Sequence, residues 1–246
     1  MKQAWRLRAV LMLAFATGAR AAAPAADTAM TEQAAQGGHY VSPAAFDWKK
    51  DLPPPPAEGS LAARADLETV LHVQETRTAE QVAEAKSIVH DDLFNNARVL
   101  GAWFTRANLP QTAEFFDAVN EDGAAAVHGI KDIYPRLRPP FADARVHPCV
   151  TLQKTHSYPS GHSSQAWMWA VLLGEIFPDQ RAALYDRARA VMWARVIGGV
   201  HYPTDTVGGE MVGRAVAAKL LENPAVRAAL VRCRAEAMPF LLKKAA

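Results

Sequence analysis

The sequence predicts an all-α protein that folds as a single compact helical domain. From Leu61 onward, apolar residues recur at helical spacing, and no stretch of the sequence makes a convincing strand. Half of the 246 residues are apolar, which is sufficient for one sizeable core. No internal repeat is present, so the chain is not expected to be a helical solenoid.

The chain begins with a segment that we expect to be a signal peptide, residues 1–21. A basic start precedes an apolar stretch that ends at the small-residue pattern Ala19-Arg20-Ala21. The stretch is too short to cross a bilayer, and so is the longest later run without charged or strongly polar residues, 166–174. We therefore expect an exported, periplasmic protein that has no membrane partner. An ordinary buried N-terminal helix is the alternative interpretation.

Composition limits the partners further. Residues 1–21 hold four of the 27 basic residues and no acidic ones, so 23 basic and 25 acidic residues remain after cleavage. This balance gives no reason to expect a nucleic-acid polymer as partner. Cys149 and Cys233 suit an oxidising compartment, and on that ground alone we predict a disulfide between them. No zinc-type Cys/His spacing occurs, so we expect no structural metal. No cofactor is expected either.

The elements follow in order. Residues 22–51 are predicted to be a flexible N-terminal arm, because they have little periodicity, and residues 52–246 to form the domain. The domain begins with a stiff polyproline segment, LPPPPAEGS, and turns helical at Leu61. Thr78 and Gln81 make a capping-box pattern for the next helix, and a proline at position 110 opens another.

The second half of the chain predicts five more helices. The segment DGAAAVHGIKDIY is helical and must end before Pro135. Residues 135–158 lack a clean period and are predicted to be a long, functional loop. Four helices follow: from Gly161 to Pro178, from there to Gly198-Gly199, from near Thr204 to about Glu222, and a last one after Pro224.

Polar residues gather at the junctions of these predicted helices. Lys131 ends one helix, and Arg138 follows in the loop. Ser160, Gly161 and His162 open the next helix. The segment ARVIGGVHYPTD contributes Arg195, His201 and Asp205. Each could be ordinary by itself: a surface charge, a helix cap, a buried histidine or a first-turn acid.

Together these residues fit phosphoryl transfer. The transferring group spreads negative charge over three oxygens, which guanidinium forks and a lysine can hold. The first backbone N–H groups of a helix add fixed dipoles that favour an anion. Two histidines suffice for one nucleophile and one general acid. Asp205 lies four residues after His201, close enough to bond its Nδ1–H and leave Nε2 free.

The segments KDIYPRLRP, PSGH and RVIGGVHYPTD resemble the three-part signature of the phosphatidic acid phosphatase type 2 superfamily, K-x6-RP, PSGH and SR-x5-H-x3-D. Within it, LPPPPAEGS and SYPSGHSS are most similar to segments of the soluble bacterial class A non-specific acid phosphatases. The resemblance covers roughly residue 52 to the C-terminus, and its specificity lies in the three motifs. It implies the helical fold shared by acid phosphatases and vanadium haloperoxidases, often as oligomers.

The resemblance also implies roles. His201 is expected to form a phosphohistidine, with Asp205 as its orienting partner, and His162 to protonate the leaving alcohol. Four groups are expected to hold the phosphoryl oxygens: Lys131, Arg138, Arg195 and the Ser160-Gly161 turn. The family uses no metal, hydrolyses phosphate monoesters, and should be inhibited by phosphate or vanadate. One position departs from the pattern, because Ala194 stands where the family usually has serine.

Two other functions remain open at this stage. A vanadium-dependent haloperoxidase resembles the same constellation, although such proteins are typically larger and nothing in the sequence marks a halide pocket. A non-catalytic periplasmic phosphate-binding protein is the second alternative. It would need hydrogen-bond donors, but it would leave both histidines unexplained.

Overall fold

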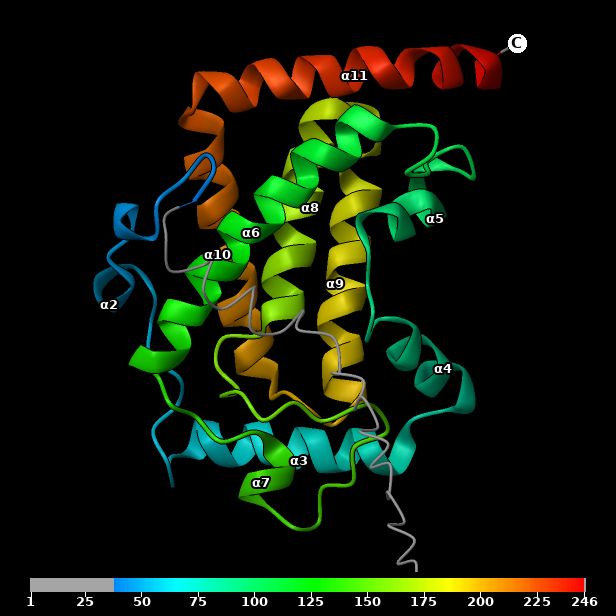
Figure 1. Ribbon diagram of the computed structural model, residues 1–246. Coiled ribbons are helices and arrows are strands. Elements are labelled where there is room, and N and C mark those ends of the chain that lie inside the picture. Colours follow the sequence, from blue (N-terminus) through cyan, green and yellow to red (C-terminus); the bar gives the residue numbers. More distant parts are fainter. Residues whose placement is uncertain (1–37, 246) are drawn as a thin grey trace, which may run out of the picture.

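The computed structural model describes residues 38–245, and within that range it contains helices and no strand (Figure 1). The all-α prediction is therefore confirmed. The predicted signal peptide, residues 1–21, and the first part of the predicted arm lie outside the described residues.

Four long helices form the body of the molecule and stand side by side (Figure 1): α6 (Pro110–Ile133), α8 (Gly161–Ile176), α9 (Arg181–Ile197) and α10 (Pro203–Glu222). Helix α8 is buried on nearly all sides, as its apolar sequence requires. Helix α11 (Pro224–Ala245) crosses one end of this group, and α3 (Leu61–Thr76) crosses the other. The predicted catalytic and phosphate-binding residues lie at or next to helix ends on the α3 side.

Helices α8 and α10 approach closely because α10 presents glycines at the contact. A Cβ atom on Gly209 would lie 2.5 Å from the carbonyl oxygen of Ser160, and one on Gly213 would lie 2.2 Å from that of Ser164. The backbone N–H of Ser160 also donates to the carbonyl of Asp205, at 2.9 Å. The start of α8 and the first turn of α10 are thereby fixed against each other.

The shorter elements mostly follow the sequence. The capping box at Thr78 opens α4 (Ala79–Ser87) as predicted. Helix α6 runs without a break, so DGAAAVHGIKDIY continues the helix that Pro110 opens and is not a separate one. A short helix, α7 (Pro139–Ala142), interrupts the predicted loop 135–158. The remaining elements are α2 (Trp48–Asp51), α5 (Ala97–Leu100), η1 (Pro43–Ala45), η2 (Leu93–Asn96) and η3 (Pro178–Gln180).

The prediction of a flexible arm is wrong for residues 38–51. The backbone N–H groups of His39, Tyr40 and Val41 donate to the carboxylate of Asp122 in α6, at 2.6, 2.9 and 3.1 Å. Trp48 is buried as well. A buried carboxylate needs several donors, and this segment supplies them from its backbone. Low periodicity in the sequence does not reveal such an anchor.

The predicted disulfide is also wrong, because Cys149 and Cys233 are both free. The backbone N–H of Cys149 bonds to the carbonyl of Gly198, just beyond the end of α9. Cys233 lies in α11, whose neighbouring Arg234 bonds to the carbonyl of Ile176 at the far end of α8. The two cysteines thus lie at opposite ends of the body. Helix α9, with 17 residues, spans about 25 Å, whereas a disulfide needs Cα atoms within about 7 Å.

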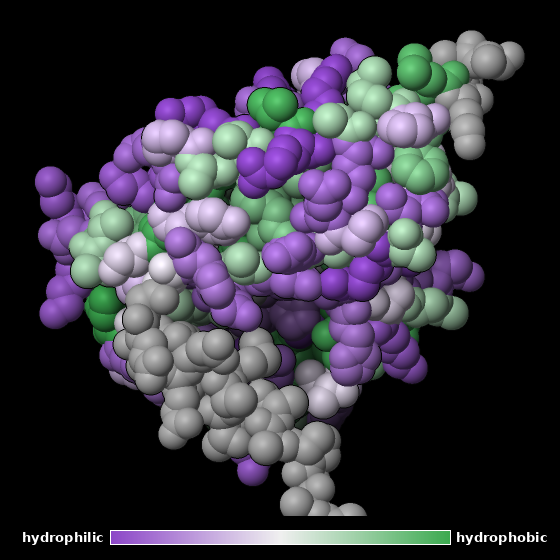
Figure 2. All heavy atoms as spheres, turned by 45° about the horizontal axis from the view of Figure 1, so that its top comes forward, coloured by the Kyte–Doolittle hydropathy of each residue, from purple (hydrophilic) through white to green (hydrophobic). Residues whose placement is uncertain are grey.

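Polar side chains cover most of the face drawn in Figure 2, with apolar residues scattered among them. Over residues 38–245, none of the helices combines the length and the apolar character that crossing a membrane requires.

Candidate active site

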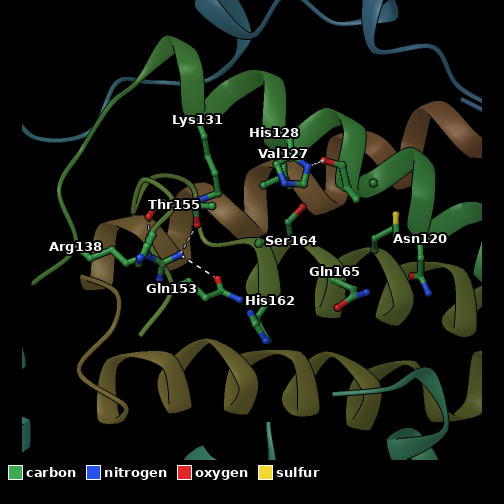
Figure 3. Close-up of a pocket in the computed structure, with 15 residues that line it drawn as sticks. Asn120, Val127, His128, Lys131, Arg138, Gln153, Thr155, His162, Ser164 and Gln165 are labelled. Carbon is green, nitrogen blue, oxygen red and sulfur yellow. Dashed lines mark hydrogen bonds between the residues drawn. The ribbon is translucent and has the colours of Figure 1, made fainter. Parts of the chain in front are cut away.

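The residues predicted from the motifs gather around one pocket between α6 and α8, with a volume of about 600 Å³ (Figure 3). Lys131, Arg138, Gly161 and His162 line it, and no aspartate or glutamate is among the lining residues. The other predicted residues are buried next to the pocket: Ser160, Arg195, His201 and Asp205. The pocket therefore presents only cationic, neutral polar and apolar groups.

The turn before α8 places His162 and a helix N-terminus at the pocket. Ser160 caps the helix, and its Oγ accepts from the backbone N–H of Ser163 at 3.4 Å and from the Ser163 hydroxyl at 2.9 Å. Gly161 lines the pocket at the first helical position, where backbone N–H groups have no intrahelical acceptor. This end of α8 consequently favours an anion.

His162 lies in the first turn of α8, and its Nε2 is 3.3 Å from the carbonyl oxygen of Val89. Burial, followed by the positive charge of Arg195, lowers the pKa of His162 to about 4. A negative charge in the pocket would oppose the effect of the cations and favour the protonated ring.

His201 follows the end of α9, where Gly199 turns the chain with a φ of +72° that only glycine adopts readily. Its Nε2 lies 3.1 Å from Arg138 Nη1, and its Nδ1 lies 3.4 Å from Asp205 Oδ2. A guanidinium can only donate, so Nε2 is the unprotonated nitrogen and Nδ1 carries the hydrogen. Burial, followed by the charge of Arg138, holds the pKa of His201 well below its usual range, which keeps the ring neutral.

Asp205 is fully buried, and burial raises its pKa while Arg136 opposes that shift. Arg136 Nη1 donates to Asp205 Oδ1 at 2.7 Å, and Nη2 donates to Asp66 Oδ2 of α3 at 2.8 Å. The guanidinium also lies over the ring of Tyr202, 4.0 Å from its centroid. Sequence reasoning missed Arg136, although the alternating arginines of YPRLRP offered a signal. It missed Asp66 as well, for which no local signal exists.

Three cations surround the phosphate position expected from the motifs. Arg138 Nε donates to the carbonyl of Thr155 at 2.8 Å, and its Nη2 contacts the Gln153 and Thr155 side chains (Figure 3). Lys131 Nζ donates to the carbonyls of His156 and Pro159, at 2.6 and 2.9 Å. Burial lowers the pKa of Lys131 to about 7 and that of Arg138 to about 10.

Arg195 differs from the other two cations. It is 1% exposed, and neither its Nε nor its Nη1 has a hydrogen-bond partner among the described residues. Burial, followed by the charge of Arg138, lowers its pKa to about 10. Buried donors without an acceptor are costly, so these two N–H groups are candidates for contact with a bound ligand. The neighbouring Ala194 is buried and offers no hydroxyl.

The structure thus brings together every predicted catalytic and phosphate-binding residue, and leaves only the predicted cysteine pair apart. Between residues 38 and 245, no three His, Cys, Asp or Glu side chains form a group that could hold a metal ion.

Comparisons with known proteins agree with this arrangement. Residues 122–226 match the family described as the PAP2 superfamily. The non-specific acid phosphatase of Providencia stuartii is 31% identical over 195 residues, which cover 75% of this chain and 78% of that protein. That of Salmonella typhimurium is 29% identical over 194 residues, with the same two coverages of 75% and 78%.

Among solved structures, a holo-type bacterial vanadium-dependent chloroperoxidase aligns with a TM-score of 0.63 and 14% identity, covering 82% of this chain and 55% of the other. A bacterial vanadium-dependent iodoperoxidase aligns with a TM-score of 0.59 and 18% identity, covering 74% and 53%. This chain therefore spans about half the length of either haloperoxidase, and at these identities the likeness concerns the fold alone.

Proposed function

The chain belongs to the PAP2 superfamily and to its non-specific acid phosphatases. From that premise we propose that it hydrolyses phosphate monoesters through a phosphohistidine on His201. We further propose that the reaction needs no metal ion and takes place after export to the periplasm. The observation that carries the proposal is the pair of unpartnered, buried N–H groups of Arg195. The positive charge of Arg195 lowers the pKa of both His162 and His201, which supports a role for this guanidinium in binding an anion close to the two candidate catalysts.

Binding of the ester is the first step. The phosphoryl oxygens take the free donors of Arg195 and the charges of Arg138 and Lys131, together with the N–H groups at the start of α8. All three cations are buried, so their attraction for a dianion is weakly screened. The same charges stabilise the transition state, in which negative charge is spread over the equatorial oxygens.

Nucleophilic attack follows from the state of His201. Its Nε2 lone pair attacks phosphorus while the bond from phosphorus to the ester oxygen breaks. His162, protonated in the complex, passes its proton to the departing alkoxide. The N–P bond leaves a positive charge on the ring, which the buried carboxylate of Asp205 stabilises. His162 then takes a proton from water, whose hydroxide attacks phosphorus and returns His201 to its neutral form.

The leaving group provides the sharpest test. p-Nitrophenolate departs with little help, whereas an alkyl alkoxide needs a proton. His162→Ala should therefore slow phosphorylation by an alkyl phosphate about 10²–10⁴-fold, and slow phosphorylation by p-nitrophenyl phosphate much less. Single-turnover rates are needed, because His162 also serves hydrolysis. His201→Ala should abolish labelling by both substrates.

The remaining parts of the proposal have separate tests. Turnover should survive a chelator and fall with vanadate, which mimics the transferring phosphoryl group. Loss of activity with EDTA that a divalent metal restores would overturn metal independence. A phosphate-binding protein without turnover would bind vanadate and form no phosphoenzyme, and label trapped on His162 in place of His201 would reverse the two roles. N-terminal mass spectrometry of periplasmic protein tests export.

A further inference from the structure

Ser157 lies between the two members of the His201–Asp205 pair. The serine is completely buried, and its Oγ donates to Asp205 Oδ2 at 2.5 Å. The same Oγ is 3.4 Å from His201 Nδ1. The direct separation between His201 Nδ1 and Asp205 Oδ2 is also 3.4 Å, so Nδ1 is equally far from both oxygens, and their capacity to accept a hydrogen bond decides between them. The strong contact to the carboxylate therefore belongs to the serine and not to the histidine.

The acceptor capacity of the carboxylate explains this difference. A carboxylate oxygen offers about two lone-pair sites. Asp205 Oδ2 already accepts the Ser157 hydroxyl and the backbone N–H of Tyr202, the latter at 2.9 Å. Asp205 Oδ1 accepts from Arg136. The Ser157 oxygen donates its single hydrogen to Asp205, so its own lone pairs are free to accept from His201 Nδ1–H.

The backbone holds Ser157 in this place. Its N–H donates to the carbonyl of Arg136 at 2.8 Å, and the side chain of the same arginine binds Asp205 Oδ1. Five residues further along the chain, His162 enters the pocket from the other side. One short segment, HSYPSGH, thus carries both the general acid and a residue that contacts the nucleophile from behind.

We propose that Ser157 is a positioning residue that relays the hydrogen bond from His201 Nδ1–H to Asp205, so that the catalytic pair works as a His201–Ser157–Asp205 chain. This inference rests on the proposed function, in which His201 is the nucleophile. The chain holds the ring in the tautomer whose Nε2 is unprotonated. When Nε2 bonds to phosphorus, the ring becomes positive, and Nδ1–H donates more strongly to a hydroxyl that the carboxylate polarises. No proton leaves the chain in this step.

The electrostatics agree with the geometry. The Ser157 hydrogen bond lowers the pKa of Asp205 and opposes the effect of burial, so it helps to keep the carboxylate ionised when the imidazolium forms.

The experiment compares Ser157→Ala with Thr206→Val. Thr206 is also buried and lies beside Asp205, but its hydroxyl bonds only to the carbonyl of Pro203, at 2.8 Å, and so makes a matched control. In single-turnover phosphorylation with p-nitrophenyl phosphate, Ser157→Ala should be slower by about 10- to 100-fold, the loss typical of one hydrogen bond to a charged group. The control should stay within about 3-fold of wild type. Affinity for inorganic phosphate, which stays unbonded to His201, should change little in either variant, because neither residue lines the pocket.

A second measurement does not depend on the variant folding. ¹⁵N NMR of histidine-labelled wild-type protein should show His201 as the Nδ1–H tautomer, with a downfield Nδ1 proton, and that signal should move in Ser157→Ala. A wild-type ring protonated at Nε2 would overturn the relay. So would a Ser157→Ala variant that keeps the wild-type phosphorylation rate and pH profile, or one that loses affinity for inorganic phosphate in proportion to rate. If wild type itself forms no phosphohistidine, the proposed function fails, which is a distinguishable result.

Discussion

Replacing Arg136 by glutamine tests how far the site depends on a buried ion pair that the motifs do not contain. Its guanidinium bridges Asp205 at 2.7 Å and Asp66 at 2.8 Å, and the three side chains are 12%, 0% and 3% exposed. Removing one partner of a buried pair typically costs about 3–5 kcal/mol, because a charge is left uncompensated. We expect a loss of this size in the free energy of unfolding at pH 7. It corresponds to a fall in Tm of about 6–20 °C for a domain of this length.

The stability that Arg136→Gln loses relative to wild type should become smaller as the pH falls. Burial raises the pKa of Asp205 and Arg136 opposes that rise, so the substitution moves the pKa of the folded state further up. A carboxyl group with a higher pKa in the folded than in the unfolded state binds more protons when folded. Stability then decreases as the pH rises through the folded pKa. The variant should therefore be closest to wild type at a pH low enough to protonate Asp205, and furthest from it at neutral pH.

Urea unfolding followed by circular dichroism at several pH values between 7 and 4 measures this difference. Arg145→Gln is the control, since Arg145 pairs with Asp143 at 2.8 Å with 63% of its side chain exposed. Arg145→Gln should change the free energy of unfolding far less than Arg136→Gln does, because surface pairs contribute little. A loss of less than about 1 kcal/mol for Arg136→Gln, or one that is equal at every pH, would refute the reasoning.

Three further predictions follow from the same contacts. Arg195→Met removes buried donors that have no partner among the described residues, so it should raise Tm in the absence of ligand. It should also abolish the increase in Tm that phosphate gives the wild-type protein. A variant whose Tm still rises with phosphate would contradict this prediction. Gly209→Ala puts a Cβ 2.5 Å from the Ser160 carbonyl oxygen, so it should lower the free energy of unfolding by about 1–3 kcal/mol and remove most activity. Gly129→Ala is the control, because its Cβ meets nothing within 4 Å; it should raise the free energy of urea unfolding by about 0.5–1 kcal/mol. The pKa of His162 is lowered to about 4 in the unliganded site, and a bound dianion should raise it by offsetting the charges of the cations. In the pH–rate profiles, the alkaline limb of kcat should therefore lie at a higher pH than the alkaline limb of kcat/KM. Coincident limbs would count against the general-acid role of His162.

The part of the site that could be predicted from the sequence is the part fixed by local structure. His162 lies in the first turn of α8, and the preceding residues Pro-Ser-Gly are typical of a turn that begins a helix. His201 and Asp205 flank the start of α10, so a spacing of four residues is enough to place them together. Lys131 lies in the last turn of α6, and Arg138 follows five residues after the helix ends. In each case, helix boundaries and short intervals in the chain determine where the side chain lies.

The rest depends on contacts between distant segments. Asp66 is one of three acidic residues in α3. An acidic residue in a half-polar helix is expected to face solvent, yet Asp66 is buried against Arg136 and the first turn of α10. Asp122 is similar, since nothing in its neighbourhood indicates that the backbone of residues 39–41 donates to it. Buried carboxylates of this kind depend on tertiary packing, because only the assembled fold supplies both their burial and their partners.

Arg136 and Arg195 show how the same residue type serves opposite purposes in one site. Both guanidinium groups are buried or nearly so, and both carry a full positive charge. Arg136 has two carboxylates of the protein as partners, so its charge is compensated before any ligand arrives. Arg195 keeps two N–H groups that find no acceptor among residues 38–245, so these groups remain available to an external anion. Stability at Arg136 and binding at Arg195 are therefore separable, and the two substitutions should move Tm in opposite directions in the absence of phosphate.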